Sequence, residues 1–394
     1  MCIRDRSQSP TATALRVGSR VLFEKITRAK VYSAADVPGS PYAITPQWLT
    51  EAICGGVPGA QVTDVKVVLV SAGTHERHRL HVTYNEAGTK GGLPGSIFAK
   101  SLPSLVTRMI AGFTAQARME SLFYKEIRPQ LTIETPLCYY TGFDKTKLAA
   151  LHLMEDLVAT KSATFCGNKT DVTRTMADGM IDLLASLHAK FHRKLDDRKT
   201  YGWLAGYPQW FTVGAEKLKI EHYTQKALDK AADLMPPGLM KRRHDLWPAT
   251  MRALEVHKTQ SPVFLHSDVH IGNWYQVDGS KMGLCDWQCA NRGHWSRDLS
   301  YMLAAGLAPE NRRKWEKDLV ARYVARFSEL TGEKLDGEQS FTWYRQQMLH
   351  ALPMWTITLC HSPLLPDMQP EDMTLEMVRR LAIAVDDLDA IGSA

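Results

Sequence analysis

Strand-like and helical patterns occupy different parts of this chain, and that division constrains the fold more than any other feature. Strands are predicted by β-branched runs or by apolar residues that alternate with polar ones, and helices by apolar residues three and four positions apart. Strand patterns occur at residues 62–70, 77–84, 96–100 and 148–154. Short helices are expected at residues 45–54 and 114–127, the second ending before Pro129. A glycine-rich loop is expected at residues 86–95.

After Leu157 the pattern becomes mainly helical. Apolar residues recur at helical spacing along Met176, Met180, Leu183, Leu184, Leu187 and Phe191. Strand patterns return only at residues 262–266 and 274–287, and the chain from Asp298 onward is helical in pattern. We therefore expect an α+β fold with two lobes joined by a hinge at residues 154–157. The small β-rich N-lobe is predicted to cover residues 41–157, and the larger, mainly helical C-lobe residues 158–394.

The N-terminal segment has a different composition from the rest. Residues 1–6 resemble translated adapter sequence, and the Arg, Ser and Thr content of the segment is also seen in transit peptides. It lacks the apolar stretch of a secretory signal. We treat residues 1–40 as an N-terminal extension, disordered or non-native at its start, and leave it out of the fold argument.

Composition limits the partners and the compartment. The net charge of +6 is modest and dispersed, which suits an anionic ligand such as a nucleotide but does not predict nucleic-acid binding. No uncharged apolar run reaches the length of about 18 residues expected of a membrane span. The seven cysteines show no CxxC spacing, so neither a zinc site nor a disulfide framework is indicated. A reducing, cytoplasmic compartment fits this cysteine usage best.

The densest group of chemically active residues follows the strand pattern at residues 262–266. His266, Asp268, His270 and Asn273 lie within eight residues, and Asp286 follows thirteen residues after Asn273. An Asp, an Asn five residues later and a second Asp form the spacing of phosphoryl-transfer loops. One carboxylate can accept the proton of an attacking hydroxyl group. The other carboxylate and the amide oxygen can hold Mg²⁺, which prefers oxygen ligands.

These residues resemble the aminoglycoside phosphotransferase-like kinases, and within them the ecdysteroid-kinase-like branch. The sequence from His266 to Asn273 is similar to the family's H-G-D-x-H-x-x-N loop, and Asp286 opens a segment similar to its D-[FW]-Q motif. Further similarities follow the family's order along residues 41–390. They are Phe98-Ala99-Lys100, Glu120 in an E-x-x-F-Y pattern, Leu153 to Leu157, Leu187 to Phe191, and Arg297-Asp298-Leu299.

The resemblance implies a protein-kinase-like fold, with ATP and Mg²⁺ as cofactors and a hydroxyl-bearing small molecule as substrate. It implies a catalytic role for Asp268, with His266 more a structural orienter than a base. For His270, loop packing and substrate contact stay open. Asn273 and Asp286 are the implied metal ligands. The implied nucleotide-binding residues are Gly73, Thr74, Lys100, Glu120, Glu155, Asp156 and Leu157.

Two departures from the family pattern are visible. Ser267 stands where the family has glycine, so the freedom of glycine at positive φ is lost there. The turn expected to cover the nucleotide, at residues 71–74, contains a single glycine, Gly73. Elsewhere, we expect His188 to be a core residue and Asp298 to brace the catalytic loop. Trp203, Tyr207 and Trp210 are expected in the core more than in a substrate pocket.

Several functions remain open at this point. An apolar alcohol is the favoured acceptor, because residues 200–250 lack the acidic clustering expected for a polycationic aminoglycoside. An aminoglycoside or hydroxyacyl-CoA kinase is the nearest alternative. The pattern His266-x-Asp268-x-His270 would also suit a metal-dependent hydrolase, although that reading leaves Lys100 and Glu120 unexplained. A non-catalytic pseudokinase is the last alternative, and the presence of both Asp268 and Asp286 argues against it.

Overall fold

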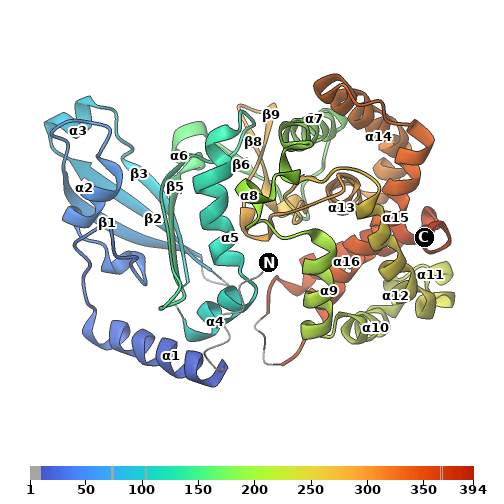
Figure 1. Cartoon of the computed structure of the whole chain (residues 1–394), viewed down its shortest axis with the longest axis horizontal. Coiled ribbons are helices and arrows are strands. Elements are labelled where there is room, and N and C mark those ends of the chain that lie inside the picture. The colour runs from blue at the N-terminus through green and yellow to red at the C-terminus, as the bar shows by residue number, and fades with distance from the viewer. Residues whose placement is uncertain (1–9, 72–74, 103, 364, 366) are drawn as a thin grey trace. The chain divides into compact units, whose positions relative to one another are not determined.

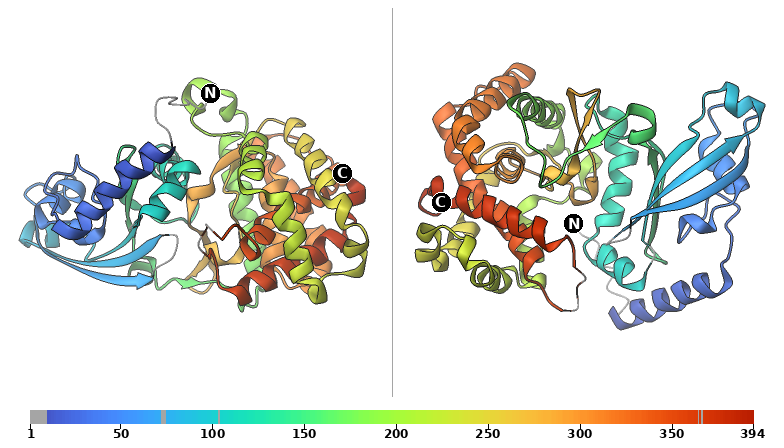
Figure 2. Two further views of the ribbon diagram at one scale, coloured as in Figure 1. Left: turned by 90° about the horizontal axis from the view of Figure 1, so that it is seen from below. Right: turned by 180° about the vertical axis from the view of Figure 1, so that it is seen from behind.

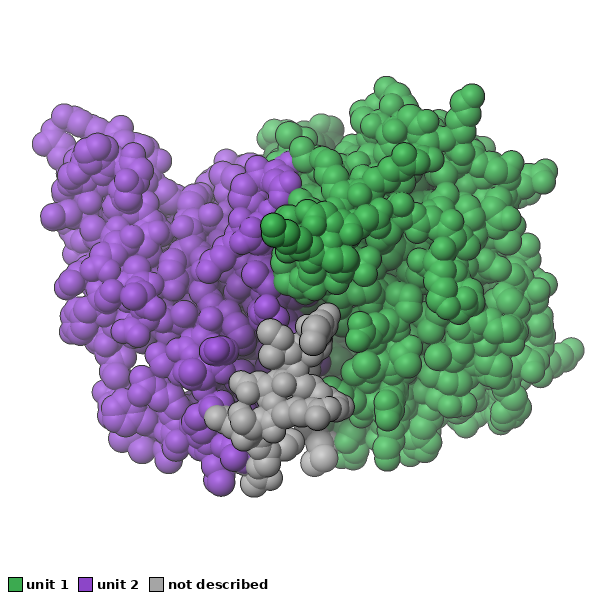
Figure 3. Space-filling view, in the orientation of Figure 1, with its two compact units in different colours: residues 1, 131–135, 164–394 green, residues 2–130, 136–163 purple. Residues whose placement is uncertain are grey.

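The computed structural model describes residues 10–71, 75–102, 104–363, 365 and 367–394, and it divides into two compact units (Figure 3). Of the described residues, unit 2 comprises those within 10–130 and 136–163, and unit 1 those within 131–135 and 164–394. Unit 2 contains an antiparallel sheet, whereas unit 1 is mostly helical. The predicted α+β fold class, with a β-rich N-lobe and a larger helical lobe, is confirmed. The predicted boundary after residue 157 lies within unit 2.

Unit 2 is built on a five-stranded sheet in the order β1-β2-β3-β5-β4 (Figure 1). The strands are β1 (Val62–Ser71), β2 (Glu76–Tyr84), β3 (Ser96–Ser101), β4 (Cys138–Asp144) and β5 (Ala149–Glu155), and every pairing is antiparallel. The four predicted strands are confirmed, and β4 is an addition. Alternation places Leu80, Ile97 and Leu153 in the core, against Trp48.

The helices of unit 2 are α1 (Pro10–Thr27), α2 (Pro46–Ile53), α3 (Glu86–Lys90), α4 (Leu105–Phe113), α5 (Gln116–Leu122) and α6 (Leu157–Lys161). Three features of residues 86–127 differ from expectation. The expected loop at 86–95 begins with α3 because Asn85 Oδ1 accepts from Gly88 N at 3.0 Å and caps the helix. The single helix expected at 114–127 is α5 followed by a π-helical turn, Phe123–Ile127. Helix α4 was not predicted.

The N-terminal segment contains the helix α1, which packs on α4. Val17 and Val21 are buried on its inner side. The N-terminal extension, expected to be disordered or non-native at its start, therefore contributes a helix to unit 2 from Pro10 onward. The first nine residues lie outside the described part of the chain, as do residues 72–74 of the turn expected at 71–74.

Unit 1 combines helices with two small sheets (Figures 1 and 2). The helices are α7 (Arg174–Phe191), α8 (Arg198–Tyr201), α9 (Tyr207–Leu218), α10 (Ile220–Lys230), α11 (Pro237–Lys241), α12 (Arg243–Arg252), α13 (Ser296–Gly306), α14 (Pro309–Thr331), α15 (Gly337–Leu359), α16 (Glu371–Asp387) and α17 (Ala390–Ser393). The strands are β6 (Thr164–Phe165), β7 (Val263–Leu265), β8 (Trp274–Val277), β9 (Lys281–Leu284) and β10 (Asn291–Gly293). Strand β7 pairs with β10, and β8 lies between β6 and β9.

The core of unit 1 lies around α13, whose residues are all buried. This helix packs against α15 and α16, and α7 packs against α14. The predicted helical face of α7 is confirmed, since Met180, Leu184 and Phe191 are fully buried. Among the described helices, none is long and apolar enough to cross a bilayer.

Candidate active site

The loop that follows β7 is fixed by one buried carboxylate. Asp298, in the first turn of α13, accepts the backbone N–H of His266 at 2.7 Å and that of Ser267 at 2.9 Å. Burial alone would raise the pKa of Asp298, but the hydrogen bond from His188 and nearby positive charge outweigh burial and lower that pKa. The predicted bracing role of Asp298 is confirmed. His188 is likewise the expected core residue, bonded to Tyr323 Oη at 2.7 Å.

Ser267 occupies the one position where the loop departs from the family pattern. Its φ is +67°, a left-handed conformation that costs a residue with a Cβ atom and that glycine adopts freely. Its Oγ is buried and makes no hydrogen bond within the described residues. Its conformation is held because Asp298 accepts its N–H and Arg297 Nη2 lies 3.4 Å from its carbonyl oxygen. The loop has therefore kept the backbone shape that glycine would give.

His266 is locked by its own neighbours. Its Nδ1 accepts the N–H of Asp268 at 3.2 Å, and its Nε2 donates to Cys285 O at 2.9 Å. Burial lowers the pKa of His266, which keeps the ring neutral with its proton on Nε2. This geometry favours the orienting role over that of a base. It also leaves neither ring nitrogen for a transition metal, which the hydrolase alternative requires.

The carboxylate of Asp268 is held from one side and is about a quarter exposed, at 26% of its side-chain area. Tyr301 Oη donates to Asp268 Oδ1 at 3.2 Å, and Trp355 Nε1 donates to Tyr301 Oη at 2.7 Å. Asn273 Nδ2 lies 3.4 Å from Asp268 Oδ2. Both aromatic residues are buried, so the carboxylate is positioned by a chain of two hydrogen bonds that begins in the core of unit 1.

Sequence reasoning missed Tyr301 and Trp355. Tyr301 follows Asp298 by three residues in α13, so the two side chains leave the helix on the same side and reach neighbouring parts of the loop. That spacing is a signal that could have identified Tyr301 once Asp298 was singled out. Trp355 comes from α15, and nothing in its local sequence points to the loop.

His270 is used mainly for packing. Its Nδ1 accepts the N–H of Gly272 at 3.1 Å, and its ring meets the ring of Trp355 edge-on at 5.3 Å between centroids. Its Nε2 lies 3.8 Å from Asp268 Oδ2, longer than a hydrogen bond. Within the described residues, the loop-packing role is therefore the one that has contacts to support it.

The two residues assigned to the metal are brought together by backbone pairing. Asn273 precedes β8 and Asp286 follows β9, and Trp274 pairs with Leu284 across the hairpin. Cys285 N donates to Asn273 O at 2.9 Å. Asn273 Nδ2 donates to Asp268 O at 2.7 Å, which directs its amide oxygen elsewhere. Asp286 adopts a left-handed conformation, with φ +68° and ψ +70°.

This donor set fits Mg²⁺ in its chemistry. One amide oxygen and one carboxylate are hard ligands, and Mg²⁺ commonly takes only one or two protein groups, with phosphate and water completing its shell. Among the residues that the structure describes, no three His, Cys, Asp or Glu side chains gather into a metal-binding group.

In unit 2, Lys100 and Glu120 form a buried ion pair. Lys100 Nζ lies 2.8 Å from Glu120 Oε2, with side chains 4% and 1% exposed. His152, the partner of Lys100 in the β3–β5 register, lies 3.6 Å from the same oxygen through Nε2. Thr141 Oγ1 contacts the other ring nitrogen of His152 at 2.8 Å. The strand lysine is therefore held rigidly by its neighbours.

The predicted hinge has its acidic side chains turned to structural contacts. Asp156 accepts two hydrogen bonds from Arg79 and one from Ser96, and these outweigh burial and lower the pKa of Asp156. Glu155 accepts from Thr160 Oγ1 and pairs with Lys161 Nζ at 3.3 Å. Both acidic side chains of the hinge are therefore engaged in structural contacts. Gly73 and Thr74 lie outside the described residues.

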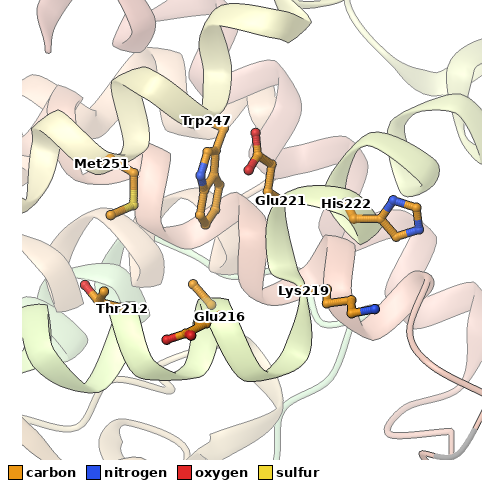
Figure 4. Close-up of a pocket in the computed structure, with 8 residues that line it drawn as sticks. Thr212, Glu216, Lys219, Glu221, His222, Trp247 and Met251 are labelled. Atoms are coloured by element: carbon orange, nitrogen blue, oxygen red, sulfur yellow. The ribbon is translucent and has the colours of Figure 1, made fainter.

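A separate groove lies between α9, α10 and α12 of unit 1 (Figure 4). It has a volume of about 550 Å³. Trp247 and Met251 face it from α12, with Glu216 from α9 and Glu221 from α10 beside them. None of its lining residues belongs to the catalytic loop. Tyr207, by contrast, is fully buried and accepts from Arg297, which confirms its place in the core.

Comparison with solved structures identifies the fold. A Ralstonia eutropha JMP134 protein, a candidate aminoglycoside phosphotransferase, superposes with a TM-score of 0.51 at 12% identity, over 88% of this chain and 96% of that one. A Plasmodium vivax ethanolamine kinase gives 0.47 at 11% identity, over 83% of each chain. A spectinomycin phosphotransferase bound to ADP and spectinomycin gives 0.47 at 12%, over 89% of this chain and 98% of that one.

Sequence comparison identifies the family. No curated protein matches this chain in sequence. The profile of the phosphotransferase enzyme family, APH, matches residues 111–341, more than half of the 394 residues. That span includes Glu120 and the whole loop from His266 to Asp286. The chain belongs to the phosphotransferase enzyme family.

Proposed function

We propose that this protein is an ATP- and Mg²⁺-dependent kinase that phosphorylates a hydroxyl group of a small molecule. The observation that carries the proposal is the environment of Asp268. Its carboxylate is partly exposed, one oxygen accepts from Tyr301, and the backbone around it is anchored by the buried Asp298. A carboxylate that is fixed but accessible suits a proton acceptor, which must meet its substrate in a defined geometry.

In the proposed reaction, Asp268 orients the acceptor hydroxyl group and receives its proton. The acceptor oxygen forms a bond to the γ-phosphorus of ATP, and the bond from that phosphorus to the β–γ bridging oxygen breaks, so that ADP leaves with the electron pair. Oδ1 accepts from Tyr301 at 3.2 Å and Oδ2 has the longer contact, 3.4 Å from Asn273 Nδ2, so we propose Oδ2 as the oxygen that takes the proton. His266 does not exchange a proton in this scheme, because both of its nitrogens are engaged.

Asn273 and Asp286 would hold the metal. When bound, Mg²⁺ would neutralise charge on the phosphate oxygens. The contribution of this chain is to fix the two ligands at adjacent points of the β8–β9 hairpin, with the nitrogen of Asn273 already bonded to the loop and its oxygen available.

Lys100 is the proposed phosphate ligand in unit 2. Its ammonium group is held by Glu120 at 2.8 Å, so little conformational entropy is lost when a phosphate binds it. The backbone at residues 154–157 is proposed to meet the adenine ring, since the acidic side chains there are committed to other contacts.

We favour an apolar alcohol as the acceptor, as in an ecdysteroid-kinase-like enzyme, over an aminoglycoside or a hydroxyacyl-CoA. An aminoglycoside site needs dense negative charge. Residues 200–250 of unit 1 show no such clustering of acidic residues, which favours a neutral acceptor over a polycation.

A substrate screen followed by one substitution tests the proposal. Mg·ATP consumption is measured against sterols, amino alcohols, aminoglycosides and hydroxyacyl-CoAs. With the acceptor found, Asp268→Asn should lower kcat by roughly 10²–10⁴-fold while ATP binding is kept, because the shape remains but the proton acceptor is lost. Asp278→Asn, at an exposed position, is the matched control. An Asp268→Asn enzyme with more than half of the wild-type kcat would rule out the assignment.

The metal assignment has its own test. Asp286→Ala should abolish transfer and weaken Mg·ATP binding, measured by calorimetry, while the far-ultraviolet circular dichroism stays that of the wild type. Unchanged Mg·ATP affinity together with normal turnover would exclude Asp286 as a ligand.

A further inference from the structure

Helix α1 has an inner face that is fully explained by unit 2. Val17 is 0% exposed and Val21 is 6% exposed, and Leu105 of α4 lies against Gly18. Glu24 Oε2 pairs with the buried Arg108 Nη2 at 2.6 Å. Because these contacts fix the rotation of α1 about its axis, its opposite face is held outward.

That outer face carries large apolar side chains that contact little. Leu15 is 71% exposed, Leu22 is 59% exposed and Ile26 is 72% exposed. Their spacing of seven and four residues places them in one row along the helix. Phe23, 49% exposed, lies beside the row. Single exposed leucines are ordinary on protein surfaces, but a row of this kind on a docked helix indicates a binding surface.

The charge around this row is strongly positive. Residues 10–30 contain five basic residues, Arg16, Arg20, Lys25, Arg28 and Lys30, and one acidic residue, Glu24, which gives a net charge of +4. Glu24 is already paired with Arg108 and with Arg20. The guanidinium group of Arg20 lies over the ring of Phe23 at 5.3 Å, so cationic and apolar groups share one surface.

We infer that the outer face of α1 is a docking surface for anionic lipid bilayers. A helix that lies in a bilayer interface buries its apolar row among the acyl chains, and flanking Lys and Arg side chains reach the anionic headgroups. The basic flanks of the row match the negative charge of such a surface. The helix lies on the bilayer, since none of the described helices could span one.

Vesicle flotation with the full chain tests this inference without any knowledge of the substrate. The wild type should float with phosphatidylcholine vesicles that contain phosphatidylglycerol, and much less with phosphatidylcholine alone. The paired substitution Leu22→Glu and Ile26→Glu should reduce the partition coefficient at least about tenfold, because apolar contact is lost and two negative charges are added. The matched control pairs Leu234→Glu with Leu330→Glu, two exposed leucines of unit 1.

A second pair of variants, which reverses charge beside the apolar row, keeps the test decisive if the first variant is unstable. Lys25→Glu with Arg28→Glu should weaken flotation, whereas Lys217→Glu with Lys226→Glu, the same change of charge at exposed positions of α9 and α10, should not. Binding should also fall as salt concentration rises. Failure of the wild type to float, or equal flotation of test and control variants, would overturn the inference. So would light scattering that shows the face to be covered by a second copy of the chain.

Discussion

Replacing Asp298 by asparagine is the sharpest test of how the catalytic loop is held. The carboxylate accepts two backbone N–H groups, at 2.7 and 2.9 Å, with its side chain wholly buried. Asparagine keeps the shape but offers a single acceptor oxygen. One N–H group of the loop would then face an amide N–H instead of an oxygen.

The expected cost follows from these two contacts. Losing one charge-assisted hydrogen bond costs about 1.5–3 kcal/mol, and leaving a buried donor unpaired costs about 1–3 kcal/mol. We therefore expect Asp298→Asn to lower the free energy of unfolding of unit 1 by about 2.5–6 kcal/mol. At about 2–4 °C per kcal/mol for a unit of this size, the melting temperature should fall by roughly 5–24 °C.

Tryptophan fluorescence is a suitable probe, because Trp48 is the one tryptophan of the ten that lies in unit 2. Thermal and urea unfolding of the variant would be compared with those of Asp245→Asn, whose side chain is 67% exposed and should change stability by less than about 0.5 kcal/mol. A melting temperature for Asp298→Asn within about 2 °C of the wild type would refute the claim that the Asp298 carboxylate holds the loop in place.

Three further predictions concern other buried groups. Ser267→Gly should raise the melting temperature by a few degrees, since it relieves a positive φ that costs about 1 kcal/mol and removes a buried hydroxyl group; a lower melting temperature would contradict this reading. Lys100→Ala should raise KM for ATP and lower kcat, Glu120→Ala should do so more mildly, and the double variant should be little worse than Lys100→Ala; simple additivity in log kcat/KM would show that the pair does not act as a unit. Burial keeps the pKa of His350 well below the ordinary value of 6.5, so the free energy of unfolding should fall as pH falls below 6.5, because the unfolded chain then binds a proton that the native state does not. In urea titrations, His350→Phe should reduce this fall in the free energy of unfolding by up to about 1.4 kcal/mol per pH unit, and an unchanged pH dependence would exclude the effect.

Local pattern was enough to predict the four strands at 62–70, 77–84, 96–100 and 148–154, because short alternating or β-branched stretches are typical of half-buried strands and a short apolar run is typical of a fully buried one, as at 148–154. It was not enough for β4, whose residues from Cys138 to Asp144 show no alternation in burial. That strand exists because β5 pairs with it along the sheet. The short helix at Glu86 was missed because the capping contact, in which Asn85 Oδ1 accepts the N–H of Gly88, outweighed the glycine content of the segment.

For the loop from His266 to Asn273, too, some features follow from local sequence and others from tertiary packing. Spacing along the chain was enough to propose the reacting groups, since phosphoryl transfer needs a carboxylate, an amide oxygen and a second carboxylate at short and specific spacing, and Asp268, Asn273 and Asp286 have that spacing. It also placed Asp298 near the loop. Only the tertiary structure decided which groups hold Asp268 in place, because Tyr301 and Trp355 lie 33 and 87 residues away along the chain and meet the loop through the packing of α13 against α15.

Tertiary contacts also decide which face of α1 is buried and which is exposed. Sequence showed a basic segment with apolar residues scattered through it, and gave no means of telling a packed face from an exposed one, because both contain large aliphatic side chains. Contact with α4 made that choice. Val17 and Val21 were buried against unit 2, so Leu15, Leu22 and Ile26 were left outside. The sequence states the chemistry of each side chain, but the packing of the folded chain decides which residues that side chain contacts.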